Sequence, residues 1–353
     1  MMKFTKLFLI ALSVSLFVSC SNDDNDDTDN EVVESKGAYE NGFFILNEGT
    51  SGQGTVSFSS NDFSAFTKDA YTTANGSDLL GKFAQNIFFD GDKAYIISGG
   101  SNVINVVNRY TFKLIAKIET GLKNPRYGVV LNGKAYVTNA NTYFDKDNPN
   151  GNTDDYVAII NLSTNTYESK IDLNATANRV VLDNGKLYIT EPYNSSKLLV
   201  VNIATKTLET PVEIGYSADC IEEENGTLYI LRGPYEDRSE IVKVKLSDKS
   251  VSKITFPESL DGASFMDIEN NKIYYTVQSA AYVMDINAAA PSTTAIVTSP
   301  ATYIYGFAVK GNRIYVANGN FVADGKAYIY NLTGTLQKEL TTGIASNGFY
   351  FND

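Results

Sequence analysis

The side chains of this sequence that could hold a ligand are mainly tyrosine, phenylalanine, asparagine and arginine, and they gather in irregular segments between short apolar runs. Aromatic rings give broad apolar contact at low entropy cost, while asparagine and arginine supply fixed hydrogen-bond donors, which suits a large neutral ligand edged with amides. Tyr143 and Phe144 stand out, because an exposed aromatic pair on a long loop has little structural purpose. The candidate ligand-binding residues are Asn47, Glu48, Asn86, Arg126, Tyr127, Asn139, Tyr143, Phe144, Arg179, Tyr193, Arg232, Tyr235, Tyr303, Tyr305, Asn320 and Phe321.

The absence of histidine from the 353 residues limits the catalytic chemistry. The chain itself cannot form a Ser-His-Asp or Cys-His triad, a histidine-ligated zinc or haem site, or a histidine general base. The acids between Asp145 and Asp155 could suit Ca²⁺, but Pro149 interrupts the spacing of an EF-hand loop. We therefore expect no catalytic residue, no metal site and no cofactor.

The candidate residues must be positioned by strands, since apolar residues alternate with period two and no segment shows sustained helical periodicity. A unit recurs in which a tight turn, commonly Asn-Gly, is followed three or four residues later by a tyrosine. Six copies are visible, and their marker tyrosines are Tyr95, Tyr136, Tyr188, Tyr229, Tyr274 and Tyr315. A period of mostly 41 to 45 residues, with about four short strands per unit, is typical of propeller blades. We expect the six tyrosines to lie in the core between blades.

A seventh unit is divided between the two ends of the chain. Residues 42–47 resemble a second strand that lacks its first, and residues 345–351 resemble a first strand that lacks its second. Pairing of the two would remove the exposed edges between the first and last blades. The sequence therefore predicts an all-β fold, a seven-bladed β-propeller over residues 41–353 that is closed by pairing of its N- and C-terminal strands.

The two faces of such a propeller differ in their connections. One face carries the hairpins between the first and second strands, which are short and uniform: Asn132-Gly133, Asn184-Gly185, Asn225-Gly226 and Asn270-Asn271. The other carries irregular connections, and all the candidate residues fall there, where loops on a rigid scaffold commonly bind ligands. For Arg126 and Arg179 the alternative is that they only line a water-filled channel.

The N-terminus is typical of a targeting segment. Lys3 and Lys6 precede an apolar run over residues 7–18, which is too short to span a bilayer and fits a signal peptide. The segment from Cys20 to Glu34 has seven acids and no base, so it cannot fold and should act as a tether. We expect a signal peptide over residues 1–19 and an acidic tether over residues 20–40. The net charge of −12 argues against a nucleic-acid partner.

Several motifs resemble known bacterial proteins. Tyr136-Val-Thr-Asn139 and Tyr315-Val-Ala-Asn318 resemble the YVTN family of β-propellers, and residues 17–20 resemble a lipobox, which implies lipid on Cys20. Together with the tether and the opening Phe44-Ile-Leu-Asn-Glu48-Gly49, they are similar to Bacteroidetes surface lipoproteins that work beside TonB-dependent transporters, some of which capture cobalamin. The resemblance implies a non-enzymatic protein of the outer membrane, held only by its lipid anchor and facing outward. It would capture a small molecule, in the first place cobalamin or another corrinoid, for such a transporter.

Two other classes of function stay open. One is a protein-interaction or glycan-binding propeller, of which a pure protein-interaction platform would show a flat apolar patch instead of a concave rim. A calcium-dependent propeller hydrolase or lactonase would need carboxylates such as Glu48, Glu191 and Asp219, together with Asn139, around a channel ion. We expect that no two of those carboxylates meet at metal distance.

Overall fold

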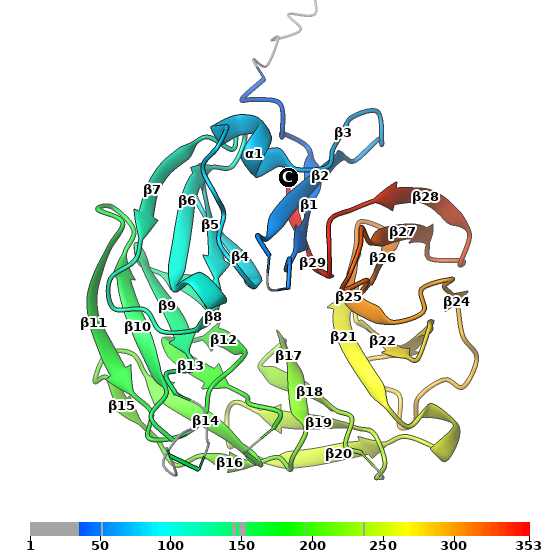
Figure 1. Ribbon diagram of the computed structural model, residues 1–353. Coiled ribbons are helices and arrows are strands. Elements are labelled where there is room, and N and C mark those ends of the chain that lie inside the picture. Colours follow the sequence, from blue (N-terminus) through cyan, green and yellow to red (C-terminus); the bar gives the residue numbers. More distant parts are fainter. Residues whose placement is uncertain (1–34, 51, 143–145, 148–152, 194, 236) are drawn as a thin grey trace, which may run out of the picture. The chain divides into compact units, whose positions relative to one another are not determined.

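Seven antiparallel sheets lie around a common centre, with each sheet forming one blade (Figure 1). The computed structural model describes residues 35–50, 52–142, 146–147, 153–193, 195–235 and 237–353, so the predicted signal peptide, Cys20, Tyr143, Phe144 and most of the predicted tether lie outside it. Residues 36–353 form one unit. The predicted all-β, seven-bladed propeller is confirmed.

The strands of each blade follow one another from the centre of the ring outward. Blade 1 comprises β29 (Ser346–Asn352), β1 (Gly42–Asn47), β2 (Thr55–Ser60) and β3 (Phe66–Thr67), blade 2 comprises β4 (Ala84–Asp90), β5 (Lys93–Ser98), β6 (Val103–Asn108) and β7 (Leu114–Ile118), and blade 3 comprises β8 (Pro125–Leu131), β9 (Lys134–Asn139), β10 (Tyr156–Asn161) and β11 (Thr166–Asp172). Blade 4 comprises β12 (Val180–Asp183), β13 (Lys186–Ile189), β14 (Lys197–Asn202) and β15 (Thr207–Leu208), with β16 (Val212–Glu213) also paired to β14.

The remaining blades follow the same plan. Blade 5 comprises β17 (Ala218–Glu224), β18 (Thr227–Arg232), β19 (Glu240–Lys245) and β20 (Val251–Thr255), blade 6 comprises β21 (Ala263–Glu269), β22 (Lys272–Val277), β23 (Ala280–Asp285) and β24 (Val297–Thr298), and blade 7 comprises β25 (Ile304–Lys310), β26 (Arg313–Asn318), β27 (Lys326–Asn331) and β28 (Leu336–Thr341). One helix, α1 (Ala70–Asn75), and the 3-10 turns Gly99–Ser101 and Glu258–Leu260 lie in the described connections. Asp69 caps α1 by accepting a hydrogen bond from the Thr72 amide at 3.1 Å.

The terminal strands close the ring in the predicted way. β29 pairs with β1 over its whole length, with Phe351 opposite Phe43 and Phe349 opposite Ile45. The side chain of Asn352 then fixes the end of the chain, because its Nδ2 donates to the carbonyl oxygens of Tyr39 at 2.5 Å and of Arg109 at 3.0 Å. The last strand of the chain is therefore the innermost strand of the first blade.

The hairpins between the first and second strands have the predicted turn geometry. Asn132 and Gly133 have φ of 51° and 72°, and Asn270 and Asn271 have φ of 53° and 58°. Two successive residues with positive φ form the turn whose twist matches that of a β-hairpin, and asparagine and glycine reach that region most easily. The face that carries these turns is called the hairpin face below, and the opposite one the rim face.

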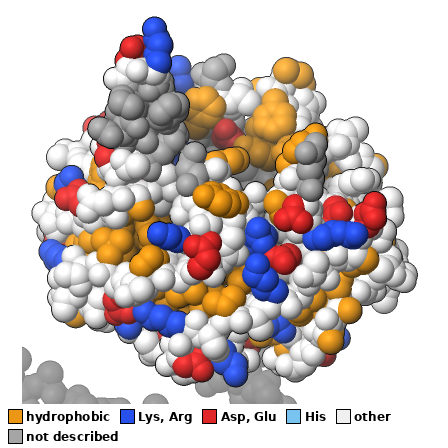
Figure 2. Space-filling view, turned by 90° about the horizontal axis from the view of Figure 1, so that it is seen from below, with side chains coloured by type: hydrophobic (Ala, Val, Ile, Leu, Met, Phe, Trp, Pro, Cys, Tyr) orange, Lys and Arg blue, Asp and Glu red, His pale blue; other side chains and the backbone are white. Residues whose placement is uncertain are grey.

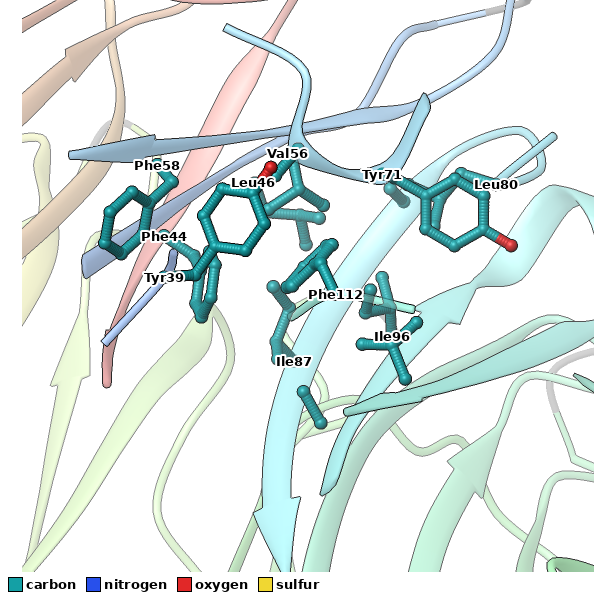
Figure 3. Close-up of a cluster of buried hydrophobic side chains, with 14 residues drawn as sticks. Tyr39, Phe44, Leu46, Val56, Phe58, Tyr71, Leu80, Ile87, Ile96 and Phe112 are labelled. Atoms are coloured by element: carbon teal, nitrogen blue, oxygen red, sulfur yellow. The ribbon is translucent and has the colours of Figure 1, made fainter. Parts of the chain in front are cut away.

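One aromatic side chain packs into each of the seven interfaces between blades. The six marker tyrosines fill six of them, and Phe44 fills the interface between blades 1 and 2. None of these seven side chains is more than 7% exposed, which confirms the predicted core. Figure 3 shows the cluster around Phe44, whose ring centroid lies 4.7 Å from that of Phe112. Burial of such a ring stabilises the fold by about 1.5–3 kcal/mol.

The outer surface carries a mixed charge pattern. Figure 2 shows basic, acidic and apolar side chains interspersed over one side of the molecule, without an extended area of one charge. Within the described part of the chain, no helix has the length and apolar character needed to cross a bilayer.

Candidate functional site

A bulge recurs at the rim-face end of the inner strand in six of the seven blades. In blade 2 the pairing passes from Ala84 opposite Ser98 to Asn86 opposite Ile97, so Gln85 is an extra residue, and Tyr305 is extra in blade 7 in the same way. A bulge changes the direction in which side chains point, and bulges are frequent beside functional sites. The residues at these six bulges are Gln85, Arg126, Tyr127, Asp219, Cys220, Ser264, Phe265, Tyr305 and Asn347.

The bulges also explain the Tyr-Val-Thr-Asn sequence. Tyr136 packs between blades 3 and 4, and Val137 packs on the opposite side, toward blade 2. The hydroxyl of Thr138 accepts from the amide of Tyr127 at 3.2 Å and donates to the carbonyl oxygen of Asn178 at 2.6 Å, which ties the bulge of blade 3 to blade 4. Every position of this motif therefore serves the architecture.

A cavity of about 260 Å³ lies at the centre of the ring, and all seven blades contribute to its wall. Three of the candidate residues line this cavity at its mouth, namely Asn86, Tyr127 and Arg179, and so does Gln85, which precedes Asn86. Gln85 donates to the Tyr127 hydroxyl at 3.1 Å, and Asn86 Oδ1 accepts from the amide of Gly128 at 3.2 Å. We call this cavity the channel. Its polar groups are fixed before any ligand arrives.

Arg179 is the central charge of the channel mouth. Its Nε lies 2.9 Å from Asp219 Oδ1, and its guanidinium lies 4.8 Å from the centroid of the Tyr127 ring. Burial alone would lower the pKa of Arg179, but Asp219 and Tyr127 hold that pKa well above its usual value. Arg179 and Asp219 therefore form a fixed ion pair in the wall.

Two carboxyl groups that the sequence reasoning missed lie along the inner strands of blades 5 and 6. Glu222 is paired with the marker residue Tyr229, and Asp267 with Tyr274, and both carboxyls line the channel. Asp267 Oδ2 accepts from the amide of Val309 at 2.7 Å. Removal from water raises the pKa of both, and for Glu222 the nearby charge of Asp267 raises it further. The sequence did contain a signal for them, because an acid occupies a repeat position that is apolar or aromatic in the other five blades. The equivalent residues there are Phe88, Val129, Val181, Ala308 and Tyr350.

Exposed apolar side chains concentrate on the rim face. Of the twelve large exposed hydrophobic residues in the described ranges, eight lie in rim-face connections and the other four lie on outermost strands. The eight are Leu79, Phe83, Tyr193, Tyr216, Tyr235, Tyr303, Phe321 and Val322. Tyr193 and Tyr235 are 82% and 90% exposed. Solvent-exposed rings of this kind contribute little to the stability of the fold, so the rim face has the character of a binding surface.

Two hollows adjoin the mouth of the channel on this face. One of about 260 Å³ is lined by Tyr193, Ser217 and Asp219, among others. The second, of about 680 Å³, lies beside it and is bordered by Tyr235 and Arg238. Both include Gly233 and Gly262, so they are continuous over blade 5.

A second aromatic group lies where blade 7 meets blade 1. The ring of Tyr305 is 5.9 Å from that of Tyr303 and 4.9 Å from that of Phe321. The Tyr305 hydroxyl donates to Glu48, and burial followed by this hydrogen bond raises the pKa of Tyr305. Glu48 therefore anchors an aromatic platform, and it is not a free carboxylate.

Three predicted ligand contacts are corrected by the structure. Asn47 is fully buried and donates to Thr55 and Ser57, and Asn139 is fully buried and accepts from the amide of Lys123. Arg232 is 8% exposed, because its guanidinium pairs with Glu240 and donates to the Tyr216 carbonyl oxygen. These side chains hold the rim-face connections from below, where they cannot reach a ligand.

Asn320 has a local role as well. Its Oδ1 accepts from the amides of Val322 and Ala323 at 3.1 Å each, which shapes the loop that presents Phe321. Among the described candidates, the structure thus brings Asn86, Tyr127 and Arg179 into the channel wall and places Tyr193, Tyr235, Tyr303 and Phe321 on the rim around it.

The acids at the end of the β9–β10 connection are used by the protein itself. Asp155 accepts from the amides of Asn141 at 3.1 Å and Ala177 at 2.8 Å, and burial raises its pKa to about 7. Asp154 accepts from the Thr142 hydroxyl at 2.8 Å. Across the described ranges, no three His, Cys, Asp or Glu side chains gather closely enough to hold a metal ion.

Comparison with known proteins identifies the family. Residues 41–263 match the family described as "Domain of unknown function (DUF5074)", and since this is more than half of the chain, the chain belongs to that family. No curated protein sequence matches it.

Among solved structures, the fold is similar to the computationally designed Ika8 protein, with a TM-score of 0.58 and 8% identity over 90% of this chain and 92% of that one. It is also similar to the dihydro-heme d1 dehydrogenase NirN in complex with DHE, with a TM-score of 0.57 and 13% identity over 90% and 76% of the two chains. Apo AztD from Citrobacter koseri has a TM-score of 0.52 and 13% identity, over 87% and 96%. At such identities the likeness extends to the fold alone.

Proposed function

We propose that this member of the DUF5074 family is a non-enzymatic binding protein that captures a small molecule on its rim face, over the mouth of the channel. The observation that carries the proposal is the concentration of eight of the twelve exposed large hydrophobic residues on this face, around fixed polar groups contributed by several blades. Open aromatic rings beside preorganised hydrogen-bond donors and acceptors are the usual composition of a small-molecule site. The hairpin face offers no such set within the described residues.

Cobalamin is the first ligand to test. Its corrin ring is large, largely neutral and edged with amides, which suits rings such as Tyr193 and Tyr303 together with amides such as Asn86. The resemblance of the tether and repeats to surface lipoproteins supports the same choice. Oligosaccharides, which also stack on exposed tyrosines, are the second class for the same assay.

Calorimetric titration of the purified protein with cyanocobalamin tests the assignment. We expect binding at micromolar concentrations, weakened by about tenfold in Tyr193→Ala and in Tyr303→Ala, since aromatic anchors dominate binding energy. Leu336→Ala is the matched control, because Leu336 is 48% exposed but lies on an outermost strand. Absence of heat at these concentrations dismisses the corrinoid, and equal affinity in all variants dismisses the rim face as the site.

We further propose that the protein is held by lipid on Cys20 at the outer surface of the outer membrane, where it delivers its ligand to a TonB-dependent transporter. The apolar run, the lipobox resemblance and the acidic tether support this location. Metabolic labelling with an alkyne fatty acid should mark the wild type and leave Cys20→Ser unlabelled. Protease treatment of intact cells should remove the propeller. A protein that stays unlabelled, or that resists the protease until cells are broken, contradicts the location.

A further inference from the structure

Arg126 lies beside the channel mouth with most of its hydrogen-bonding capacity unused. It belongs to the bulge of blade 3, and its Nε donates to Asn178 Oδ1 at 3.1 Å. A guanidinium carries five N–H donors, and this bond uses one of them. Within the described residues, no hydrogen bond or ion pair occupies the other four, which belong to the two terminal nitrogens. The forked end of Arg126 is therefore available to a ligand.

The position of this fork is fixed by a chain of contacts. Asn178 is 8% exposed, and its Nδ2 donates to Asp219 Oδ1 at 3.3 Å, which sets the orientation of the amide that receives Arg126. The backbone of Asn178 is held in turn, since its amide donates to the Thr190 carbonyl oxygen at 2.9 Å. Arg126 is half-buried, so its side chain is confined between blades 3 and 4.

The nearby carboxylates have other hydrogen-bond partners, and within the described residues none of them forms an ion pair with Arg126. Asp219 is occupied by Arg179 at 2.9 Å and by Asn178. Glu191 accepts from the amide of Tyr193 at 3.1 Å. Removal from water raises the pKa of Tyr193, Asp219 raises it further, and Arg126 acts in the opposite direction. Tyr193 and Asp219 also line the same hollow, so the Tyr193 phenol lies near the contacts that join Asp219, Asn178 and Arg126.

We propose that Arg126 and Tyr193 form an oxyanion subsite, which binds a phosphate or carboxylate group of the captured ligand at the channel mouth. Two parallel N–H groups match the two oxygens of either group, and the bond is charge-assisted. The Tyr193 hydroxyl supplies a second donor from the hollow that Tyr193 and Asp219 line. This inference rests on the proposed function, and it adds that the ligand carries a negative charge.

Binding of inorganic phosphate and of acetate, followed by NMR chemical-shift titration of the full propeller at constant ionic strength, tests the subsite. We expect saturable binding of at least one of the two anions, weakened by about tenfold in Arg126→Gln because a charge-assisted hydrogen bond is lost. Tyr193→Phe should weaken the same anion by about threefold. Arg313→Gln is the matched control, because Arg313 lies at the start of β26, next to the hairpin face, and donates to Gln337 Oε1 at 3.1 Å and to the Asn61 carbonyl oxygen at 2.6 Å.

The outcomes separate the subsite from the ligand assignment. Tighter phosphate than acetate identifies a phosphate group, and the reverse identifies a carboxylate. Equal anion binding by wild type and Arg126→Gln overturns the subsite even if cyanocobalamin binds. Anion binding that depends on Arg126 supports the subsite even if cyanocobalamin gives no heat, in which case only the corrinoid assignment fails. Loss of anion binding in Arg313→Gln to the same extent also overturns the subsite, since it reports general attraction to the positive charges of the protein.

Discussion

Replacing Asn352 by alanine should loosen the closure of the ring at its last residue. The side chain is fully buried, donates to the carbonyl oxygens of Tyr39 and Arg109, and accepts from the Nε of Arg109. A neutral hydrogen bond contributes about 0.5–1.5 kcal/mol net, and one to a charged partner about 1.5–3 kcal/mol. Because alanine would leave two carbonyl oxygens and a guanidinium without these partners, we expect the free energy of unfolding to fall by about 3–5 kcal/mol.

Urea denaturation followed by circular dichroism measures this change. Asn287→Ala is the control, because Asn287 is exposed, and it should change the free energy of unfolding by less than about 0.5 kcal/mol. Hydrogen exchange should show faster opening of the β1–β29 ladder in Asn352→Ala, with the other blades less affected. A loss below about 1 kcal/mol would refute the reasoning, since it would mean that pairing of β29 with β1 closes the ring without this side chain.

Three further predictions concern the channel wall. The pKa values of Glu222 and Asp267 are raised in the folded state, so their contribution to stability is full below the ordinary carboxyl pKa of about 4 and is lost as pH rises through the folded values. Thermal unfolding should therefore shift to lower temperature above neutral pH in the wild type, and less so in Glu222→Gln. Thr138→Val removes the hydroxyl that joins Tyr127 and Asn178 and should cost about 1–3 kcal/mol in urea denaturation, whereas Thr138→Ser should cost less. Gly128→Ala would place a Cβ atom 2.6 Å from the Phe88 ring, so it should lower the free energy of unfolding measured in urea by about 1–3 kcal/mol.

The sequence was sufficient for the architecture because each blade repeats the same local signals. Asn132-Gly133 and its equivalents determine where the strands reverse, and the marker tyrosines determine which side of each strand packs on the next blade. The split seventh blade followed from the same comparison, because residues 42–47 supply the second strand of a blade and residues 345–351 supply its first strand.

The site was less predictable, because the bulges break the period of two. Counting alternate residues along β17 does not reveal which side chains enter the channel once Asp219 and Cys220 together face one partner residue. Asn47 and Asn139 are the last residues of β1 and β9, where a ligand-binding residue could also lie, yet their amides satisfy backbone and hydroxyl groups of the fold. Sequence alone does not distinguish these two uses of asparagine, since both follow from the same hydrogen-bonding groups.

The order of charges along the channel favours retention of a ligand at the mouth. Arg126 lies in the bulge of blade 3, and Arg179 pairs with Asp219 in the bulge of blade 5. Glu222 lies three residues beyond Asp219 along β17, at a rise of about 3.3 Å per residue. Asp267 lines both the channel and a separate hollow of about 540 Å³, to which Glu269 and Lys310 at the hairpin-face ends of β21 and β25 also contribute. Because burial raises the pKa values of Glu222 and Asp267, these carboxyls ionise only as pH rises through and above neutral, so an anionic group would be attracted at the first position and would meet increasing repulsion about 10 Å deeper as pH rises. Such an arrangement suits capture and release on one face rather than passage through the ring, and the inner barrier would strengthen with rising pH.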